Sequence, residues 1–319
     1  MGQLIIKRML LAIPTLFVVS VLMFLLLFVG PNPLEMLQQD PGFTAEDVER
    51  LTKLYGWDQP VHRQYIDWAT GFVRGDWGES IQQQVPARDV IMERLPLTLL
   101  LTGASMMFSL MIAIPIGAYI AINKYSKADY FATAATFAMM ATPSFFLALL
   151  LQLLALQIGD WRGGEMFFYT AGAPRDLTFS ELVGRLTLPI VALSLLQIAG
   201  WSRYQRSQLV TVLESEYIKA AMAKGLPKRH VYIKHAMRNT MLPIITIVAI
   251  DLATLFGGAV ITETIFALPG MGTLLLDSVN SRDVVVVLNI VMIGAFLMVL
   301  FNALADVMYG VLDPRVRVK

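Results

Sequence analysis

Glu216-Tyr-Ile-Lys-Ala-Ala-Met-Ala-Lys-Gly225-Leu-Pro227 is the stretch from which the interpretation of this chain starts. It is rich in alanine, it lies on a basic segment between two long apolar blocks, and glycine and proline end it. Gly225 suits the left-handed position that closes a helix, and Pro227 prevents the helix from continuing. So short a helix is unstable alone in water, whereas packing into a groove on another protein would stabilise it. Composition alone favours the alternative, an ordinary basic loop with one helical turn.

The start of this short helix has two candidate caps. Thr211 and Glu214 fit a capping box, in which the two side chains satisfy free backbone N–H groups. Ser215 is an equally good N-cap residue. After the helix, residues 228–243 are expected to form a second helical stretch that leads into the next apolar block.

The composition indicates a membrane protein with several helical spans. Of the 319 residues, 56% are hydrophobic and 15% are charged, against about 25% charged residues in a soluble domain. The absence of cysteine excludes disulfides, thiolate metal sites and iron–sulfur clusters. Among the three histidines, His230 and His235 are five residues apart, off the spacing of three or four that shares a helix face, so no metal site is expected. The net charge of +1 gives no indication of nucleic-acid binding.

Six apolar blocks are long enough, or nearly so, to cross a bilayer, which takes about 20 apolar residues in a helix. The first block follows Lys7-Arg8 and is too long for the apolar part of a signal peptide, so we expect an uncleaved membrane helix. The fourth block is short, and Pro189 lies near its start. The six predicted spans cover residues 9–29, 97–122, 131–158, 186–201, 242–261 and 284–309.

The charges of the loops predict which side of the membrane each loop faces. The N-terminus, residues 123–130, residues 202–241 and the C-terminal tail together carry 15 lysines and arginines against four acids. The loops 30–96, 159–185 and 262–283 carry 10 lysines and arginines against 18 acids. The more basic side is cytoplasmic by the positive-inside rule, so both termini are expected in the cytoplasm.

Residues 31–96 are predicted to form a small helical cap on the outer mouth of the bundle. Thr44 can cap a helix over residues 45–55, and Gly56 can end it. A second amphipathic pattern covers residues 61–73. The alternative is a solvated loop that merely covers the ends of the membrane helices.

The pattern Glu216-x-x-x-Ala220-Ala221-x-Ala223-x-Gly225 resembles the "EAA" loop of the permeases of binding-protein-dependent ABC importers. The residue types, their spacing, the cytoplasmic side and the position between the fourth and fifth spans all agree. In that family the loop forms a coupling helix that sits in a cleft of the ATPase subunit. The resemblance implies a coupling site in which Glu216 makes a polar contact with the ATPase groove and small residues permit close approach: Ala220, Ala221, Ala223 and Gly225.

Further stretches narrow the resemblance to the B-type subunit of oligopeptide and dipeptide permeases. It covers nearly the whole chain and implies the type I ABC importer permease fold, an all-α membrane protein with six transmembrane helices and an extracytoplasmic helical cap between spans 1 and 2. Two departures, Gly30-Pro-Asn-Pro33 and the long loop 159–185, face outside and bear on the substrate rather than on the fold. The matching stretches are Arg8…Ile13-Pro14, Leu54-Tyr-Gly-Trp-Asp-Gln-Pro60, Tyr65…Trp68, Arg74-Gly-Asp-Trp-Gly78, Glu93-Arg-Leu-Pro96-Leu-Thr, Glu263-Thr-Ile-Phe266-Ala-Leu-Pro269-Gly-Met-Gly272 and Asp306-Val-Met-Tyr309-Gly-Val-Leu-Asp313-Pro-Arg315.

The resemblance also implies which partners the chain works with. No Gly-x-x-x-x-Gly-Lys-Ser/Thr phosphate loop occurs in the sequence, so ATP and Mg²⁺ are expected on partner ATPase subunits, and this chain is expected to be a transport subunit and not an enzyme. The expected partners are a second, distinct C-type permease, two ATP-binding cassette domains, an extracytoplasmic substrate-binding protein and membrane lipid. The chain is expected in the bacterial inner membrane, with 1–96 as first span plus cap and 97–319 as a core that carries the cytoplasmic coupling loop 202–241.

Three acids in or near the spans are candidates for the translocation pathway: Asp251, Glu263 and Asp306. An intramembrane carboxylate is a functional candidate because its exposure to lipid is unfavourable. The alternative for Asp251 and Asp306 is a hydrogen bond that fixes helix packing, and for Glu263 it is a charged helix end among solvated headgroups. The same packing alternative holds for Gln152, Gln157 and Gln197, and kinks are expected at Pro115, Pro143 and Pro189.

Three rival functions stay open beside peptide import. Similar permeases carry nickel, glutathione, opines or oligosaccharides, and a permease sequence does not distinguish these cargoes because the binding protein does most of the selecting. An intramembrane hydrolase would use Asp251 and would need a second acid at similar depth, for which only Asp306 is available. An ion-driven transporter would show internal repeats, and the sequence has no convincing one.

Overall fold

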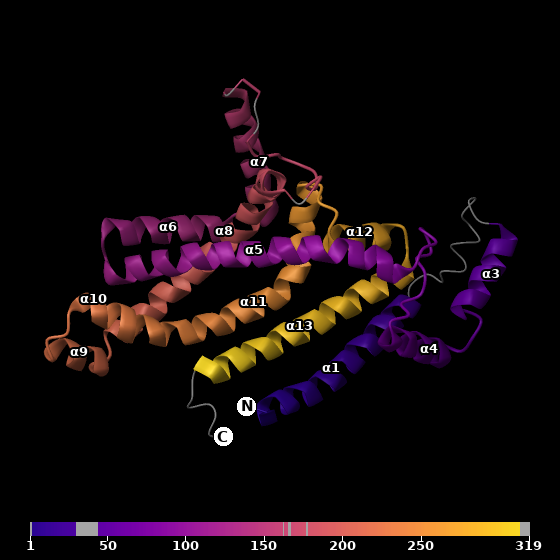
Figure 1. Cartoon of the computed structure of the whole chain (residues 1–319), viewed down its shortest axis with the longest axis horizontal. Helices are drawn as coiled ribbons and strands as arrows, with labels where there is room; N and C mark the ends of the chain where they lie inside the picture. Colours follow the sequence, from indigo (N-terminus) through magenta and orange to yellow (C-terminus); the bar gives the residue numbers. More distant parts are fainter. Residues whose placement is uncertain (1, 30–43, 162, 165–166, 177, 313–319) are drawn as a thin grey trace. The chain divides into compact units, whose positions relative to one another are not determined.

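The structure is a computed structural model of the chain that describes residues 2–29, 44–161, 163–164, 167–176 and 178–312. Within these ranges the chain is almost entirely helical (Figure 1), which confirms the all-α expectation for the part described. The chain divides into two compact units, one made of Gly2–Pro96 with Gly270–Leu300 and the other of Leu97–Pro269 with the segment from Phe301 onward. The predicted division into 1–96 and 97–319 stays a prediction.

The first unit brings together helices from both ends of the sequence. The predicted first span lies within its first helix, and the predicted sixth span lies within its last. Its helices are α1 (Gly2–Val29), α3 (Ala45–Tyr55), α4 (Val61–Arg74), α12 (Met271–Asn280) and the greater part of α13 (Val284–Leu312).

Local capping explains why α3 begins and ends where the sequence predicts. The hydroxyl of Thr44 accepts a hydrogen bond from the backbone N–H of Asp47 at 3.2 Å, and the Asp47 carboxylate accepts one from the backbone N–H of Thr44 at 3.1 Å. Gly56 ends the helix in the left-handed conformation, at φ 62°. The two predicted helices of this region, α3 and α4, are therefore confirmed, whereas their place outside the membrane stays a prediction.

The segment that follows α4 is hydrogen-bonded to α12 and α13 within the same unit. Asp283 is buried, and its carboxylate accepts hydrogen bonds from the hydroxyl of Ser80 and, at 3.4 Å, from the backbone N–H of Gln82. The amide of Asn289 donates to the carbonyl oxygen of Trp77 at 2.7 Å. Because Ser80 and Asp283 are 203 residues apart in the sequence, these bonds help to join the two stretches of this unit.

The second unit holds the remaining helices. It takes in α5 (Ala87–Ile122) from Leu97 onward, and the predicted second, fourth and fifth spans lie within α5, α8 and α11. After α5 come α6 (Lys127–Ala141), α7 (Ser144–Trp161), α8 (Phe179–Leu213), α9 (Glu216–Ala223), α10 (Lys228–His230), the π-helix η1 (Val231–Met237) and α11 (Arg238–Ile265).

The prediction of a single helix over residues 131–158 is wrong. α6 ends at Ala141, and α7 begins at Ser144. Pro143 lies between them, and a proline lacks the backbone N–H and holds the preceding residue in an extended conformation. Thr142 is indeed extended, at φ −93° and ψ 129°. Pro143 thus separates two helices, whereas Pro189 lies inside the continuous helix α8.

Four helices in the described residues are long and apolar enough to cross a membrane: α5, α7, α8 and the segment Val284–Leu304 of α13. α1 contributes a shorter apolar segment, Leu10–Leu26. In α11 the side chains of residues 252–258 lie outside the described part of the chain. The count of six spans therefore stays a prediction.

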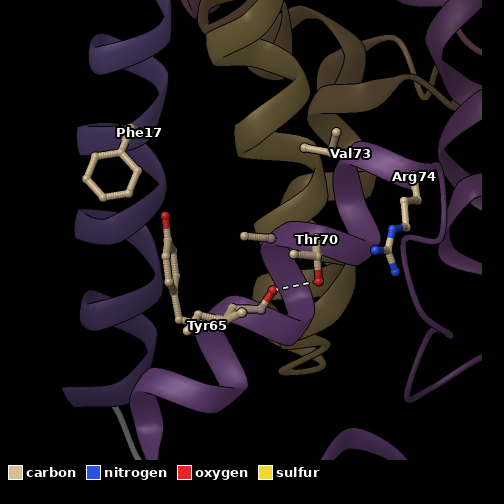
Figure 2. Close-up of a pocket in the computed structure, with 7 residues that line it drawn as sticks. Phe17, Tyr65, Thr70, Val73 and Arg74 are labelled. Carbon is tan, nitrogen blue, oxygen red and sulfur yellow. Dashed lines mark hydrogen bonds between the residues drawn. The ribbon is translucent and has the colours of Figure 1, made fainter.

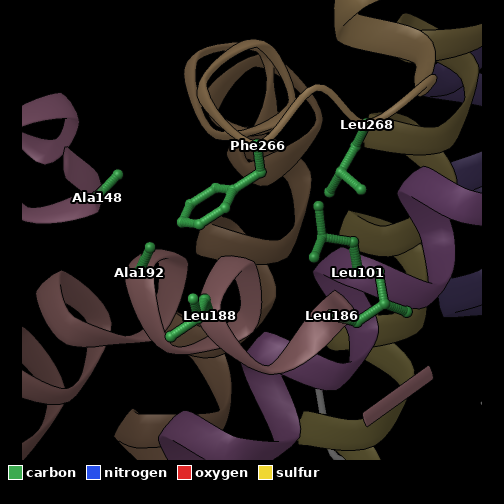
Figure 3. Close-up of a cluster of buried hydrophobic side chains, with 7 residues drawn as sticks. All are labelled: Leu101, Ala148, Leu186, Leu188, Ala192, Phe266 and Leu268. Atoms are coloured by element: carbon green, nitrogen blue, oxygen red, sulfur yellow. The ribbon is translucent and has the colours of Figure 1, made fainter. Parts of the chain in front are cut away.

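A hydrophobic cluster joins α5, α7, α8 and the end of α11 in the second unit (Figure 3). In a bilayer the lipid tails are as apolar as these side chains, so the cluster holds the helices together through close van der Waals packing and not through removal from water. Its buried members are Leu101, Ala148, Leu186, Leu188, Ala192, Phe266 and Leu268.

The connection between α7 and α8 is hydrogen-bonded to this part of the unit. The backbone N–H of Tyr169 donates to the carbonyl oxygen of Gly184 at 2.8 Å, and that of Gly172 donates to the carbonyl oxygen of Phe266 at 2.8 Å. The guanidinium of Arg185 lies 4.3 Å from the centre of the Tyr169 ring. Tyr169 and Gly172 thus attach this long loop to α8 and to the end of α11.

Helices α5 and α8 come into close contact at Gly117. A methyl group on Gly117 would lie 2.6 Å from the carbonyl oxygen of Ser202 and 2.7 Å from Cβ of Gln205. Both distances are too short for non-bonded atoms, so any side chain at Gly117 would push one of the backbones away. On the same helix, a methyl group on Gly103 would have no atom within 4 Å.

Gly117→Ala is expected to destabilise the protein by about 1–3 kcal/mol, because overpacking forces the two helices to shift. Gly103→Ala is the matched control and is expected to be neutral or stabilising by up to about 1 kcal/mol, since alanine is the better helix former. Thermal unfolding of both variants in detergent measures the difference. Equal midpoints for the two variants would contradict the close contact.

Candidate functional site

The helix predicted at residues 216–225 is present as α9 (Figure 1). Ser215 is its N-cap residue in an extended conformation, and its hydroxyl donates to the carbonyl oxygen of Val212 at 2.5 Å. The predicted capping box is wrong, because α8 continues to Leu213 and the hydroxyl of Thr211 donates to its own helix at 3.1 Å. Gly225 follows α9 at φ 79°, the left-handed conformation expected of it.

The two faces of α9 differ in what they contact. Ile218 is 0% exposed and belongs to a buried cluster with Leu209 of α8 and Val231 of η1. Ala221 is half-buried against the same cluster, so this residue of the predicted coupling site faces its own chain. The other predicted residues of the coupling site are exposed: Glu216, Ala220, Ala223 and Gly225.

Glu216 lies at the first turn of α9 with its side chain 89% exposed. It forms an ion pair with Lys219 at 2.8 Å, and such an exposed pair contributes little to stability. The neighbouring Tyr217 accepts a hydrogen bond from the side-chain amide of Asn239 at 2.6 Å, which links α9 to α11. Glu216 is therefore accessible on a helix that is itself held in place.

An ion pair joins Arg206, near the C-terminal end of α8, to Asp129 in the first turn of α6. The Arg206 guanidinium donates to both carboxylate oxygens of Asp129, at 2.6 and 2.7 Å, and the backbone N–H of Tyr125 donates to the same carboxylate at 2.9 Å. The hydrogen bond from Arg206 holds the pKa of Asp129 below its ordinary value, although burial acts to raise it. A second pair, between Lys124 and Glu214 at 2.9 Å, is more exposed.

The expectation that His230 and His235 do not share a helix face is wrong. Their ring centroids are 5.6 Å apart, in an edge-to-face arrangement. The reason is the π-helix η1, which places more residues in each turn than an α-helix and so brings residues five apart together. Within the described residues no group of three or more His, Cys, Asp and Glu side chains is placed to hold a metal ion.

Asp251 in α11 is hydrogen-bonded to α8. The indole N–H of Trp201 donates to its carboxylate at 2.6 Å, and Trp201 is 3% exposed. Asp251 itself is half-buried. This bond is of the kind that the packing alternative for Asp251 describes, and the residue as a whole is not fully enclosed.

Glu263 is fully enclosed, at 0% exposure, so the expected alternative of a charged end among solvated headgroups is wrong. The hydroxyl of Thr98 in α5 donates to its carboxylate at 2.6 Å, which joins α5 to α11. Asp306 lies in α13, and its side chain is outside the described part of the chain. The pairing of Asp251 with Asp306 that a hydrolase would need stays untested, because the Asp306 side chain is outside the described part of the chain.

Two of the predicted intramembrane glutamines serve helix packing. The Gln152 amide donates to the carbonyl oxygens of Thr170 and Ile265, at 2.7 and 2.9 Å. Gln197 accepts a hydrogen bond from the hydroxyl of Ser109 at 2.7 Å, while its own amide nitrogen is buried without a partner.

Two polar residues of α8 were not predicted from the sequence. Trp201 is the partner of Asp251, and Gln205, one turn further, is 0% exposed and donates to the Thr240 hydroxyl at 3.1 Å. The side-chain oxygen of Gln205 is buried without a partner. The available signal was the spacing of four residues, which puts Trp201 and Gln205 on one helix face toward α11.

Two family descriptions cover almost the whole sequence. The description "Binding-protein-dependent transport system inner membrane component" matches residues 113–318. The corresponding N-terminal description, for the membrane component of a binding-protein-dependent transport system, matches residues 1–102.

Curated relatives match along their full length. The oligopeptide transport system permease protein AppB of Bacillus subtilis (strain 168) is 36% identical over 321 residues, with 99% of each chain covered. The dipeptide transport system permease protein DppB of Escherichia coli (strain K12) is 32% identical over 338 residues, with 100% of each covered. The glutathione transport system permease protein GsiC of the same strain is 31% identical over 316 residues, with 99% of each covered.

A solved structure shares the fold. A chain from the inward-facing MetNI methionine ABC transporter has a TM-score of 0.57 to this structure and covers 70% of this chain and 96% of its own length. At 15% sequence identity, the likeness concerns the fold alone.

Arg206→Gln is expected to lower the free energy of unfolding by on the order of 3 kcal/mol at neutral pH, because the Asp129 carboxylate stays buried without its partner. Since folding lowers the pKa of Asp129, the pair stabilises the protein above the ordinary aspartate pKa of about 3.9, and this contribution is lost as the pH falls through the lowered value. The deficit of the variant should therefore shrink in acid. Denaturant unfolding of the wild type and the variant, at neutral and at acid pH, measures this deficit in the free energy of unfolding.

Lys124→Gln is the matched control, since it removes only the exposed pair with Glu214 and is expected to have little effect. Equal losses in the two variants at neutral pH would contradict the role given to Arg206. A deficit of Arg206→Gln that is unchanged in acid would do so as well.

Proposed function

The chain belongs to the family of binding-protein-dependent transport system inner membrane components, and on that basis we propose that it is the permease subunit of an ATP-driven importer of oligopeptides or dipeptides. The proposed substrate class rests on full-length relatives at 36% and 32% identity, which are named as oligopeptide and dipeptide permeases. Glutathione import is the second candidate, because a permease named for glutathione is 31% identical over the whole length.

The two-sided packing of α9 is the observation that supports a coupling helix. Its inner face is anchored by Ile218, while Glu216, Ala220 and Ala223 are exposed on the outside. A methyl group on Gly225 would have no atom within 4 Å, so another surface can approach the backbone there. We propose that this exposed face sits in a groove of an ATPase subunit, where small side chains permit close contact and Glu216 makes a polar one.

The anchoring of α9 matters because a coupling helix has to transmit free energy. Shifting a two-state population from 1:99 to 99:1 takes about 5.5 kcal/mol of differential binding. A flexible loop would lose part of this free energy as conformational entropy. The contacts of Ile218 and Tyr217 hold α9 to α8, η1 and α11, so a displacement of α9 is passed to the bundle.

The partners follow from the same proposal. ATP and Mg²⁺ would bind to two ATPase domains, since this sequence has no phosphate loop. A distinct C-type permease would complete the pathway, and an extracytoplasmic binding protein would deliver the substrate. The chain would lie in the bacterial inner membrane with both termini in the cytoplasm, as the loop charges indicate.

Asp251, Glu263 and Asp306 are proposed as residues of the translocation pathway, and Asp251 has the most support. It is half-buried and bonded to Trp201, so unlike Glu263 it is not fully enclosed by the chain. Glu263 is enclosed with Thr98 and would line a pathway only after α5 and α11 separate.

Ala220→Trp is expected to abolish ATP-driven uptake while the subunit still inserts and folds, because the new side chain points away from its own bundle and into the proposed groove. Ala220→Ser, which keeps the small size, is the matched control and should transport normally. Uptake of a labelled dipeptide is measured in vesicles that contain the complete transporter, with glutathione as the competing substrate. Wild-type uptake by a stable Ala220→Trp transporter would exclude the coupling role.

Glu216→Lys is expected to reduce transport and the binding of the ATPase subunit together. Lys219→Gln is its control, since it breaks the same surface ion pair but leaves the Glu216 charge in place. Copurification of the ATPase subunit with each permease variant measures binding directly. Equal behaviour of the two variants would mean that the Glu216 carboxylate makes no contact of its own.

Asp251→Asn is expected to impair uptake while it preserves the fold, because the asparagine oxygen can still accept the hydrogen bond from Trp201. Trp201→Phe removes the donor, and it should lower stability because it leaves Asp251 with one bond fewer. Uptake kinetics and thermal unfolding of both variants separate the two effects. Normal uptake by the Asp251→Asn transporter would remove this residue from the proposed pathway.

A further inference from the structure

A hollow lies between α1 and α4 in the first unit (Figure 2). It is a shallow, open depression with a volume of about 370 Å³. Every side chain that lines it is uncharged except that of Arg74. The lining residues are Phe17, Tyr65, Ile66, Ala69, Thr70, Val73 and Arg74.

The few hydroxyl groups that line the hollow are already hydrogen-bonded within the chain. The Tyr65 hydroxyl shares a hydrogen bond of 2.8 Å with the Ser20 hydroxyl of α1, and the Tyr65 ring meets Phe17 and Phe24 edge-on. The Thr70 hydroxyl donates to the carbonyl oxygen of Ile66 in its own helix, at 2.7 Å. A peptide or another polar ligand would therefore find few hydrogen-bonding partners here.

The apolar surface of the hollow continues along the membrane helix. Phe17 is 58% exposed and lies within the apolar segment Leu10–Leu26 of α1. On α4, Val73 is 86% exposed, and no residue of that helix is buried. Other large side chains of α1 are also exposed: Leu10, Leu11, Ile13, Val18, Leu22, Leu25 and Leu26. In a bilayer, hydrocarbon chains cover such a surface.

The one charged residue of the lining is Arg74, the last residue of α4. It lies at the other end of the row of lining side chains from Phe17 (Figure 2). Its side chain is exposed and forms no ion pair with any residue in the described ranges. A guanidinium in this position can bind a phosphate through two parallel hydrogen bonds.

We propose that the hollow binds one acyl chain of an anionic membrane phospholipid, with the lipid phosphate at Arg74. The acyl chain would cover Phe17, Ile66 and Val73, which otherwise leave an apolar hollow open. The bound lipid would then hold the amphipathic helix α4 against the membrane helix α1. This site is independent of the coupling helix and of the substrate that is transported.

Photoreactive lipids test the proposal on the complete transporter. Phosphatidylglycerol or phosphatidylcholine with a diazirine in the acyl chain is incorporated into vesicles with the transporter, and mass spectrometry locates the adducts. We expect adducts on the peptides that contain Phe17 and residues 65–74, with phosphatidylglycerol favoured about fivefold, the effect of one basic side chain on an anionic lipid. Arg74→Gln should reduce this preference to about one, since the zwitterionic lipid depends less on the charge.

Arg63→Gln is the matched control, because Arg63 is exposed on the same helix but does not line the hollow. It should leave the preference for the anionic lipid unchanged. Ala69→Trp fills the hollow and should suppress the adducts of both lipids there. Should Ala69→Trp fail to assemble, Ile66→Ser is the second variant, since Ile66 is 53% exposed and a serine there makes the wall polar without a burial defect.

Three results would overturn the proposal. The first is an adduct pattern that the filling and polar variants leave unchanged. The second is an equal loss of lipid preference in Arg74→Gln and Arg63→Gln, which would indicate a general charge effect. The third is a structure or cross-link of the assembled transporter in which a polypeptide occupies the hollow.

Discussion

The second unit depends on helix α8, which contacts different helices along its length and therefore has to match apolar surfaces in one half and polar groups in the other. The first half of α8 packs apolar side chains against α5, α7 and the end of α11, while its second half carries polar groups that bond to α11 and α6. Most of these polar side chains have a hydrogen-bonding counterpart, because an unpaired polar group inside a helix bundle is costly. The principal pairs are Trp201 with Asp251, Gln205 with Thr240, and Arg206 with Asp129. The close contact at Gly117 is possible because glycine adds no side chain between α5 and α8.

The short helix α9 owes its stability to this arrangement. An isolated helix of eight residues would not persist in water. Burial of Ile218 beside Leu209 and Val231 stabilises it by about 1.5–3 kcal/mol, and the π-helical turn that follows sets the direction in which the chain returns to the bundle. The helix is thus firmly attached on one side and open on the other, the arrangement that a transmitting contact with another subunit requires.

The acids of the membrane region show why a polar residue in a span is an ambiguous signal. Asp251 and Glu263 each accept a hydrogen bond from another helix, from Trp201 and Thr98 respectively. Both bonds fix packing, but only Asp251 keeps part of its surface exposed. A carboxylate that is enclosed in one conformation can line a pathway only if the helices around it separate, so the proposed role of Glu263 requires a motion, whereas the one proposed for Asp251 does not.

The sequence by itself determined the helical membrane class, the family, both ends of α3 and the glycine turn after α9. Thr44, Gly56 and Gly225 act through backbone groups a few residues away, so local sequence was sufficient to place them. The structure showed three outcomes of local backbone geometry that the sequence pattern left open: Pro143 breaks a helix, a π-helical turn brings His230 to His235, and Ser215 and not Thr211 is the cap. Only the tertiary structure decided which side of α9 is buried and which residues Asp251 and Glu263 contact. Such outcomes depend on atoms that packing brings together from distant parts of the chain, and periodicity along one helix shows which face is apolar but does not say what that face will meet.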